Sequence, residues 1–193
     1  MLNMVTGTVK DLKPAMAQAL SVYRYNIFVE KMGWPLECQE GNEQDEFDRE
    51  DTLYVVAHDS NNEVCGCARL LPTHKPYLLG EVFPELMEGA ALPHSSDIWE
   101  LSRFALSTPK NKVLTAAQSW QNNIALMSKV VDAASARGAH RLIAFSGVGN
   151  ERLLKRAGLN IHRISKPHLI DNKPVVAFWI EIDNQTRNAL GLQ

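Results

Sequence analysis

The sequence has few cysteines and no excess of positive charge, and each shortage excludes a class of protein. Its 193 residues include three cysteines, Cys38, Cys65 and Cys67. Cys65-Gly66-Cys67 is C-x-C rather than C-x-x-C, and no histidine pair with zinc-ligand spacing follows. We therefore expect no metal site and no disulfide, but small thiols buried on a strand. The formal net charge of -2 excludes a broad nucleic-acid-binding surface.

Long apolar runs, repeats and low-complexity segments are also lacking. No apolar stretch has membrane-spanning length, so we expect no membrane span. The opening "MLNMVTGTVK" lacks the basic stretch and apolar core of a signal peptide, which favours a cytoplasmic location. With 45% hydrophobic and 22% charged residues the composition is that of an ordinary globular protein, and we expect a single domain over residues 1–193.

Apolar periodicity and turn residues predict alternating helices and strands. Between Asp11 and Val29 apolar side chains recur at steps of three and four residues, which indicates a helix. A second, longer helix carries an apolar stripe from Trp120 to Ala134 and is expected to stop at Gly138. Short helices are expected at 81–88 and 151–157, and strands at 52–58, 64–73, 98–106, 141–146, 160–165 and 175–182. This order predicts an α/β (α+β) fold with a mixed sheet flanked by helices.

The expected strand "DIWELSRFAL" contains two charges, Glu100 and Arg103, in otherwise apolar surroundings. Burying an unpaired charge is costly, so both residues must meet partners or face a ligand cleft. Strict alternation places the two side chains on opposite faces of the strand. If both serve one cleft, the strand must bulge or end between them.

Other charged and aromatic side chains occur at positions where an ordinary core would have none. With the two strand residues they form a set of three arginines, three carboxylates and three aromatic rings: Arg24, Phe28, Trp34, Asp45, Asp48, Arg69, Phe83, Glu100 and Arg103. The charges balance, and the rings could face a cation. The residues alone leave two interpretations open, a structural ion-pair network or a binding site.

The runs that carry these residues resemble one family. "YR…F…W", then D-x-x-D, "CARLLPT" and "WELSRFA" follow one another between about Tyr23 and Phe104, as in the acyl-homoserine-lactone synthases, the LuxI-type autoinducer synthases. "ERLLKRAGL" and "PVVAFWIEID" resemble the second half of the family. The resemblance implies an N-acetyltransferase-like fold, a mixed twisted sheet in a three-layer αβα sandwich.

The same resemblance implies a reaction. An acyl group passes from acyl carrier protein to the amine of S-adenosyl-L-methionine, and lactone closure releases methylthioadenosine. S-adenosylmethionine is a substrate in this scheme, so no cofactor is expected. Because only a neutral amine attacks a thioester, a base is needed, and Glu100 is the candidate. Arg103 and Arg69 could anchor the substrate carboxylate or order the carboxylates around it, while backbone N–H groups would stabilise the oxyanion.

The remaining members of the set suit the cationic substrate. Arg24 is expected to hold Asp45 or Asp48 in place. The carboxylates and rings that suit a sulfonium and an ammonium are Asp45, Asp48, Phe28, Trp34 and Phe83.

Two further groups carry weaker expectations. An acyl-chain pocket could be lined by Phe104, Trp120, Ile124, Met127 and Ser146, although the helical members also suit an ordinary core. Ser146 falls near a position where a threonine often accompanies 3-oxo acyl chains in the family that the sequence resembles, and a serine leaves that preference open. We expect an unsubstituted medium-length chain. A basic docking patch for the acidic carrier protein could be formed by Arg152, Lys155 and Arg156, which equally suit a solvated helix face.

Two alternatives compete with the synthase interpretation. An acyl-CoA-dependent N-acyltransferase of the same fold would place a glycine-rich loop after the "WELSRFA" strand, to hold the pyrophosphate of CoA. Here the strand is followed by "STPKNKVLT", which has no glycine and favours a carrier-protein donor. A non-catalytic ligand-binding relative would not need Glu100, so the presence of that residue argues against it.

Overall fold

The computed structural model describes residues 2–109 and 112–192, so two residues of "STPKNKVLT", Lys110 and Asn111, lie outside the described residues. By contacts the chain divides into two compact units, Met1–Arg69 with Arg103–Val130, and Leu70–Ser102 with Val131–Gln193. Strands β3 and β4 and helix α3 pass from one unit into the other. The single domain expected over residues 1–193 stays a prediction.

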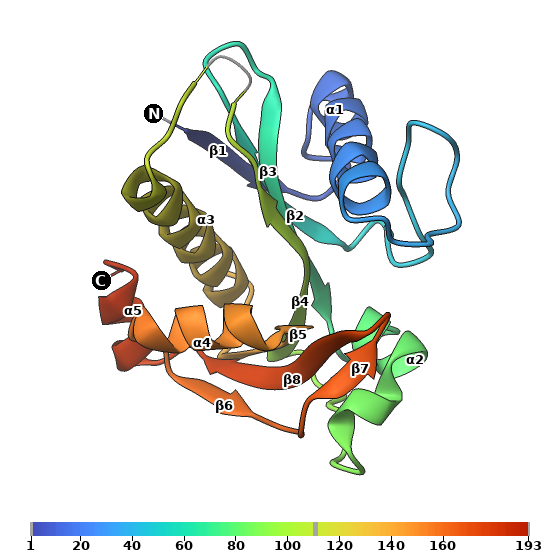
Figure 1. Ribbon diagram of the computed structural model, residues 1–193, viewed down its shortest axis with the longest axis vertical. Helices are drawn as coiled ribbons and strands as arrows, with labels where there is room; N and C mark the ends of the chain where they lie inside the picture. Colours follow the sequence, from blue (N-terminus) through green and yellow to red (C-terminus); the bar gives the residue numbers. More distant parts are fainter. Residues whose placement is uncertain (1, 110–111, 193) are drawn as a thin grey trace. The chain divides into compact units, whose positions relative to one another are not determined.

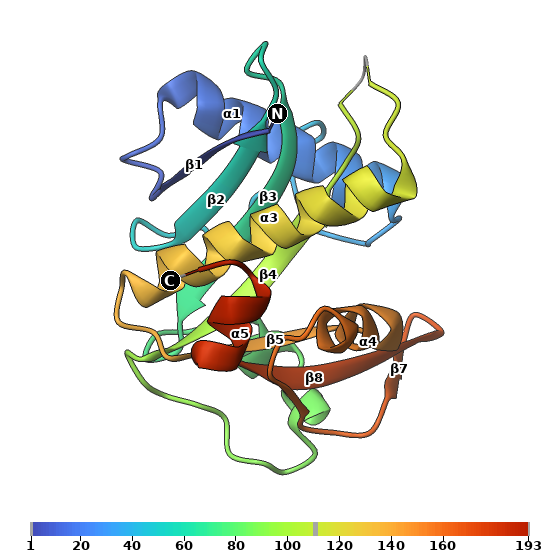
Figure 2. The same ribbon diagram turned by 90° about the vertical axis from the view of Figure 1, so that its left-hand side faces the viewer.

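In the first unit a sheet carries helices on both faces. Strand β1 (Asn3–Gly7) runs antiparallel to β2 (Leu53–His58), which is followed by β3 (Val64–Pro72) and then β4 (Ile98–Leu106). Helix α1 (Pro14–Arg24) and α3 (Ala116–Ser135, here up to Val130) lie on opposite sides of β2 and β3 (Figures 1 and 2). The arrangement gives this unit three layers.

The core of the first unit explains why the first helix packs as it does. One face of the helix contributes Leu20 and Tyr23, which pack with Tyr54 and Val56 of β2. The Tyr23 hydroxyl donates to the carbonyl of Cys65 at 2.9 Å, which satisfies its polar end in this core. Burying such an apolar face stabilises a helix that propensity alone would leave marginal.

The second unit is built around β5 and β8. The first part of β4 runs parallel to β5 (Arg141–Gly147), with Ile98 opposite Arg141. Strand β8 (Lys173–Glu181) is antiparallel to β5 and also pairs with β6 (Ile161–Arg163) and β7 (His168–Ile170). The helical segments of this unit are α2 (Leu78–Val82), the 3₁₀ turn η2 (Pro84–Met87), α4 (Val148–Arg156) and α5 (Asn184–Ala189). Figure 2 shows α4 and α2 on opposite sides of β8.

All the expected helices and strands are found, and the mixed sheet flanked by helices is confirmed. Three short elements, β1, β7 and α5, were not expected, because three to six residues carry too little periodicity. The first helix changes form: from Tyr25 to Lys31 it continues as a π-helix, η1. In the described residues no helix is long and apolar enough to span a membrane.

The two strand cysteines are buried thiols, as expected. Cys65 and Cys67 lie in β3, and burial raises the pKa of Cys65 to about 11 and that of Cys67 to about 12. Cys38 differs, because it is half-buried and lies outside any strand.

Candidate active site

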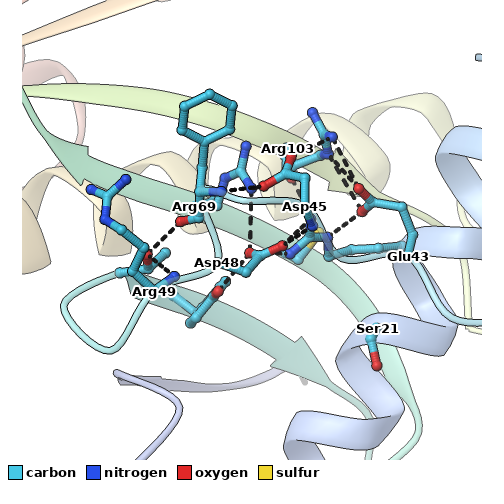
Figure 3. A network of polar contacts seen from close by, with 12 residues as sticks. Ser21, Glu43, Asp45, Asp48, Arg49, Arg69 and Arg103 are labelled. Atoms are coloured by element: carbon cyan, nitrogen blue, oxygen red, sulfur yellow. Dashed lines mark hydrogen bonds and ion pairs between the residues drawn. The ribbon is translucent and has the colours of Figure 1, made fainter. Parts of the chain in front are cut away.

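A buried cluster of three arginines and three carboxylates lies in the first unit. Arg24 ends α1, Arg69 lies in β3 and Arg103 lies in β4. The carboxylates come from one loop between η1 and β2, which supplies Glu43, Asp45 and Asp48 (Figure 3). The loop is therefore attached to the helix and to both strands by charge-assisted hydrogen bonds.

Arg24 is held by two carboxylates. Its NH1 and NH2 donate to the two oxygens of Asp48 at 2.6 and 2.9 Å, and its Nε donates to Glu43 at 2.5 Å. Burial disfavours the charged guanidinium, but the attraction of Asp48 and Glu43 outweighs it and raises the pKa of Arg24. Arg24 was expected to hold Asp45 or Asp48, and it binds Asp48.

Asp48 is the most heavily hydrogen-bonded carboxylate of the cluster. Besides Arg24 it accepts from the hydroxyl of Tyr54 at 2.6 Å and from NH1 of Arg69 at 3.3 Å. The backbone N–H of Asp45 donates to its other oxygen at 2.8 Å. Burial alone would raise the pKa of Asp48, but Arg24 and Arg69 hold it well below its usual value.

Asp45 bridges the two strand arginines. Its Oδ1 accepts from NH1 of Arg69 at 2.5 Å and from the backbone N–H of Phe47 at 2.9 Å. Its Oδ2 accepts from NH2 of Arg103 at 2.9 Å. The arginines proposed as carboxylate anchors thus already bind carboxylates of the protein.

Glu43 completes the cluster and was not among the expected site residues. Only 1% of it is exposed, and NH2 of Arg103 donates to its Oε1 at 2.9 Å in addition to the bond from Arg24. Burial would raise the pKa of Glu43, but Arg24 and then Arg103 lower it. The residue was missed because it lies in an acidic loop without periodicity. Charge balance gave no signal for it, because the expected set already matched three arginines with three carboxylates, and only the structure places Glu100 in the other unit.

Two aromatic residues of the expected set, Phe28 and Trp34, lie in the first unit and stack on each other beside Arg103. The rings of Phe28 and Trp34 are 4.9 Å apart, and Cζ of Arg103 lies 5.4 and 5.7 Å from them. Phe28 lies in the π-helix η1, and Gly33, with φ +71°, turns the chain so that Trp34 returns over it. The pair therefore already faces one cation, the guanidinium of Arg103.

Strand β4 is irregular at Arg103, in the segment where a bulge or an end was expected if Glu100 and Arg103 serve one cleft. Arg103 has φ +51°, in the left-handed region that non-glycine residues rarely adopt. Regular alternation is therefore interrupted between Glu100 and Arg103. Such strained residues persist where surrounding contacts hold them, and here Glu43 and Asp45 hold the side chain.

The other two residues of the expected set, Glu100 and Phe83, belong to the second unit. Glu100 is fully buried in β4, and its Oε2 accepts the backbone N–H of Leu79 at 2.6 Å, at the start of α2. Phe83 follows α2 and contacts Phe145 of β5, with ring centres 5.1 Å apart. Burial, and then the charge of Glu100, raises the pKa of Tyr77 to about 12.

The residues expected for the acyl chain lie in different elements. Met127 is buried in α3, whereas Trp120 is 36% exposed and Ile124 half-buried on the same helix. Phe104 is half-buried in β4. Ser146 lies in the second unit, half-buried in β5 next to Phe145.

The basic residues expected at a docking surface lie on α4. Arg152 and Arg156 are exposed. Lys155 is engaged in the same helix, because its Nζ lies 2.7 Å from the buried carboxylate of Glu151. Glu151 also binds Arg163 at 2.6 Å.

Comparison with solved structures first defines the class of fold. The chain superposes with a TM-score of 0.64 on an acyl-CoA N-acyltransferase from Pseudomonas aeruginosa at 16% identity, covering 93% of this chain and 99% of that one. A crystal structure of TofI in a ternary complex with an inhibitor and MTA is more similar, with a TM-score of 0.84 and 43% identity over 99% and 97% of the two chains. The structure of a CoA-dependent acyl-homoserine lactone synthase, BjaI, with SAM and isopentyl-CoA has a TM-score of 0.84 at 27% identity, covering 100% of this chain and 90% of BjaI. The protein has the N-acyltransferase fold.

Sequence comparison then defines the family. The model of the autoinducer synthases matches residues 10–190. An acyl-homoserine-lactone synthase of Acinetobacter nosocomialis is 43% identical over 94% of this chain and 100% of its own length. Another, from Ralstonia nicotianae, is 45% identical over 94% of this chain and 89% of its own length. The chain belongs to the autoinducer synthase family and is an acyl-homoserine-lactone synthase, an enzyme that makes a quorum-sensing signal, which confirms the resemblance.

Proposed function

We propose that this enzyme acylates the amine of S-adenosyl-L-methionine with an acyl group carried by acyl carrier protein, and releases methylthioadenosine as the lactone closes. Two relatives support the first substrate: BjaI is known with SAM and TofI with MTA. No cofactor is needed, since the leaving group is already activated as a sulfonium. The cytoplasmic location stays a prediction.

One observation carries the choice of a cationic substrate. The arginines of the cluster are almost completely buried, whereas Trp34 is 36% exposed and the side chain of Asp45 is 15% exposed. The accessible surface of the cluster and of the aromatic pair beside it is therefore formed by an aromatic ring and a carboxylate. Such a surface suits a sulfonium and an ammonium, through cation–π attraction and a charge-assisted hydrogen bond.

The chemistry requires one proton acceptor and precise placement. The amine nitrogen forms a bond to the thioester carbon and the carrier thiol leaves, while the amine loses a proton to a base. Glu100 is the proposed base, and the hydrogen bond from Leu79 fixes its carboxylate. The substrate carboxylate oxygen then attacks the carbon next to the sulfonium, whose sulfur leaves with the bonding electrons as a neutral thioether. Holding these two groups together contributes roughly 7–11 kcal/mol.

The choice of donor rests on charge and on the loop after β4. Arg152 and Arg156 are exposed on α4 and suit the acidic carrier protein. The segment "STPKNKVLT" contains no glycine for a pyrophosphate loop. BjaI, however, is a CoA-dependent member of the family. We therefore treat acyl-CoA as the competing donor, to be separated by experiment.

The decisive experiment is a product mass spectrum. The purified chain is incubated with S-adenosylmethionine and a set of acyl groups, each supplied once on carrier protein and once on CoA. We expect an N-acyl homoserine lactone and an equal amount of methylthioadenosine, formed faster from carrier protein, and with an unsubstituted medium-length chain preferred. Methylthioadenosine release without a lactone, or no release at all, would contradict the proposal; the second result would favour a non-catalytic relative.

The docking surface can be tested in the same assay. Arg152→Glu with Arg156→Glu is preferable to a change at Lys155, because Lys155 pairs with buried Glu151. The double variant should raise KM for acyl carrier protein by about tenfold and leave KM for S-adenosylmethionine unchanged. An unchanged KM for the carrier would remove α4 from the docking surface.

A further inference from the structure

The backbone of Arg103 has a conformation that its neighbours must stabilise. Its φ of +51° lies in the left-handed region, which costs a non-glycine residue free energy unless surrounding contacts offset it. Glu43 and Asp45 bind the far end of the side chain. An arginine side chain is long and flexible, so its guanidinium can keep such partners in more than one backbone conformation. These ion pairs alone therefore do not fix the backbone of Arg103.

A buried thiol on the neighbouring strand contacts that backbone directly. Sγ of Cys67, in β3, donates to the carbonyl oxygen of Arg103, in β4, at 3.1 Å. Cys67 is 1% exposed and packs in the same core as Phe28 and Ala105. A positive φ turns the carbonyl of a strand residue away from its regular direction, and a side chain of the adjacent strand can then reach it. The thiol thus holds β4 at the residue where the strand is irregular.

Cys67 is a hydrogen-bond donor at neutral pH. Burial raises the pKa of its thiol to about 12, in spite of the opposing attraction of Arg24. The thiol is therefore protonated, which a donor requires, and it lacks the thiolate that a nucleophile would need. These properties suit a role in positioning another residue and exclude a covalent role at neutral pH.

Cys65 differs from Cys67 mainly in what its thiol contacts. It lies on the same face of β3, two residues earlier, and is 2% exposed. Its Sγ lies 3.6 Å from the carbonyl oxygen of Ala57, which belongs to β2 on the other side of β3. The two cysteines therefore match in size, face and burial, and the chain offers its own control.

We propose that Cys67 is a positioning residue for Arg103: its thiol holds the Arg103 carbonyl and so stabilises the left-handed backbone that aims the guanidinium at its carboxylate and aromatic partners. Without this hydrogen bond β4 can return towards regular alternation, which turns the Arg103 side chain towards the opposite face. Glu43 and Asp45 would then lose a shared partner. Because Arg103 is a proposed site residue, the loss of activity expected from this change rests on the proposed function.

The hydrogen bond itself is tested by infrared spectroscopy of the S–H stretching bands. Hydrogen bonding lowers the frequency of an S–H stretch, and a shorter bond lowers it more. The difference between the spectra of the unmutated chain and Cys67→Ala isolates the band of Cys67, and Cys65→Ala isolates that of Cys65. We expect the Cys67 band at the lower frequency, since its Sγ is 3.1 Å from its acceptor and that of Cys65 is 3.6 Å. A Cys67 band at an equal or higher frequency would overturn the proposal.

The positioning role is tested by kcat/KM for S-adenosylmethionine with saturating acylated carrier protein. For Cys67→Ala we expect a fall of about tenfold or more, as for a displaced site residue. Cys67→Ser restores a donor and should stay within about threefold of the unmutated chain. Cys65→Ala should also stay within about threefold, although both alanine variants should lower the melting temperature similarly, because both remove one buried sulfur. The split between activity and melting temperature separates positioning from a purely structural role.

The other outcomes each contradict a stated part of the proposal. Equal falls in kcat/KM for Cys67→Ala and Cys65→Ala would make Cys67 structural. Impairment of Cys67→Ser as severe as that of Cys67→Ala would show that the donor is not what Arg103 requires. If Cys67→Ala does not fold, Cys67→Val, which fills the space without a donor, should show the same fall. Failure of the unmutated chain to form a lactone would overturn the proposed function, and the infrared comparison would then decide whether Cys67 holds Arg103.

Discussion

At the residue scale, Glu100 combines a proposed chemical role with a structural one. Its carboxylate accepts the N–H of Leu79 at the start of α2, and a glutamine at this position could still accept that bond through its amide oxygen. The change Glu100→Gln therefore separates the two roles, because it removes the base and keeps the acceptor. We expect kcat to fall by about tenfold or more and Kd for S-adenosylmethionine to stay within about threefold.

The measurement is lactone formation under saturating substrates, combined with calorimetry. Glu85→Gln is the matched control, since Glu85 is exposed on η2 in the same unit and should leave kcat unchanged. A kcat near that of the unmutated enzyme would exclude Glu100 as the base. An equal drop in kcat and in substrate affinity would point to a damaged α2 instead.

At the scale of the element, helix ends depend on backbone conformation more than on side-chain contacts. Gly138 follows the end of α3 with φ +84°, and its N–H donates to Ser135 at 2.9 Å. Gly149 lies inside α4, exposed, with no atom within 4 Å of an added Cβ. The same substitution should therefore act in opposite directions at the two positions.

We expect Gly138→Ala to lower the free energy of unfolding by about 1 kcal/mol, because alanine is strained at positive φ. Gly149→Ala should raise it by about 0.5–1 kcal/mol, since alanine loses less backbone entropy in a helix. Urea denaturation of both variants beside the unmutated chain checks this. Equal effects of the two changes would show that Gly138 does not adopt the positive φ described for it after the end of α3.

At the scale of the whole molecule, the buried ion pairs couple stability to pH. The pKa values of Glu43 and Asp48 are lowered on folding from their ordinary values of 4.5 and 3.8. Between the folded-state and unfolded-state pKa values the unfolded chain therefore binds more protons than the folded one. The two carboxylates contribute fully to the free energy of unfolding above about pH 5, and this contribution is lost as the pH falls below their ordinary pKa values. Stability should decline steeply with acid.

Acid destabilises many proteins, so the useful measurement is a difference. Glu43→Gln should lower the free energy of unfolding at pH 7 by about 3–5 kcal/mol, because it leaves Arg24 and Arg103 buried with one partner fewer. This gap from the unmutated chain should narrow as pH is lowered towards 3. A gap that stays constant over that range would show that folding does not lower the pKa of Glu43.

Much of this protein was predictable because local patterns decide it. The apolar steps of α1 and α3 identify which faces of these helices are buried, since a helix presents fixed spacings to the core. Strand β3, by contrast, is buried on both faces. The order of the charged and aromatic residues between Tyr23 and Phe104 identified the family, and with it the fold. The irregularity of β4 was expected only on the condition that Glu100 and Arg103 serve one cleft; the strand is irregular at Arg103, and the shared cleft stays a prediction.

The partners of the charges were decided by the tertiary structure. The choice of Asp48 for Arg24, the inclusion of Glu43 and the stacking of Phe28 and Trp34 beside Arg103 join segments up to 75 residues apart in sequence. The sequence pattern likewise did not predict the π-helical form of η1 or the short elements β1, β7 and α5. The physical reason is that periodicity indicates only which face of a helix or strand is buried. An ion pair depends on which loops and strands lie next to each other in the fold. A loop has no periodic pattern, so its neighbours cannot be predicted from its sequence.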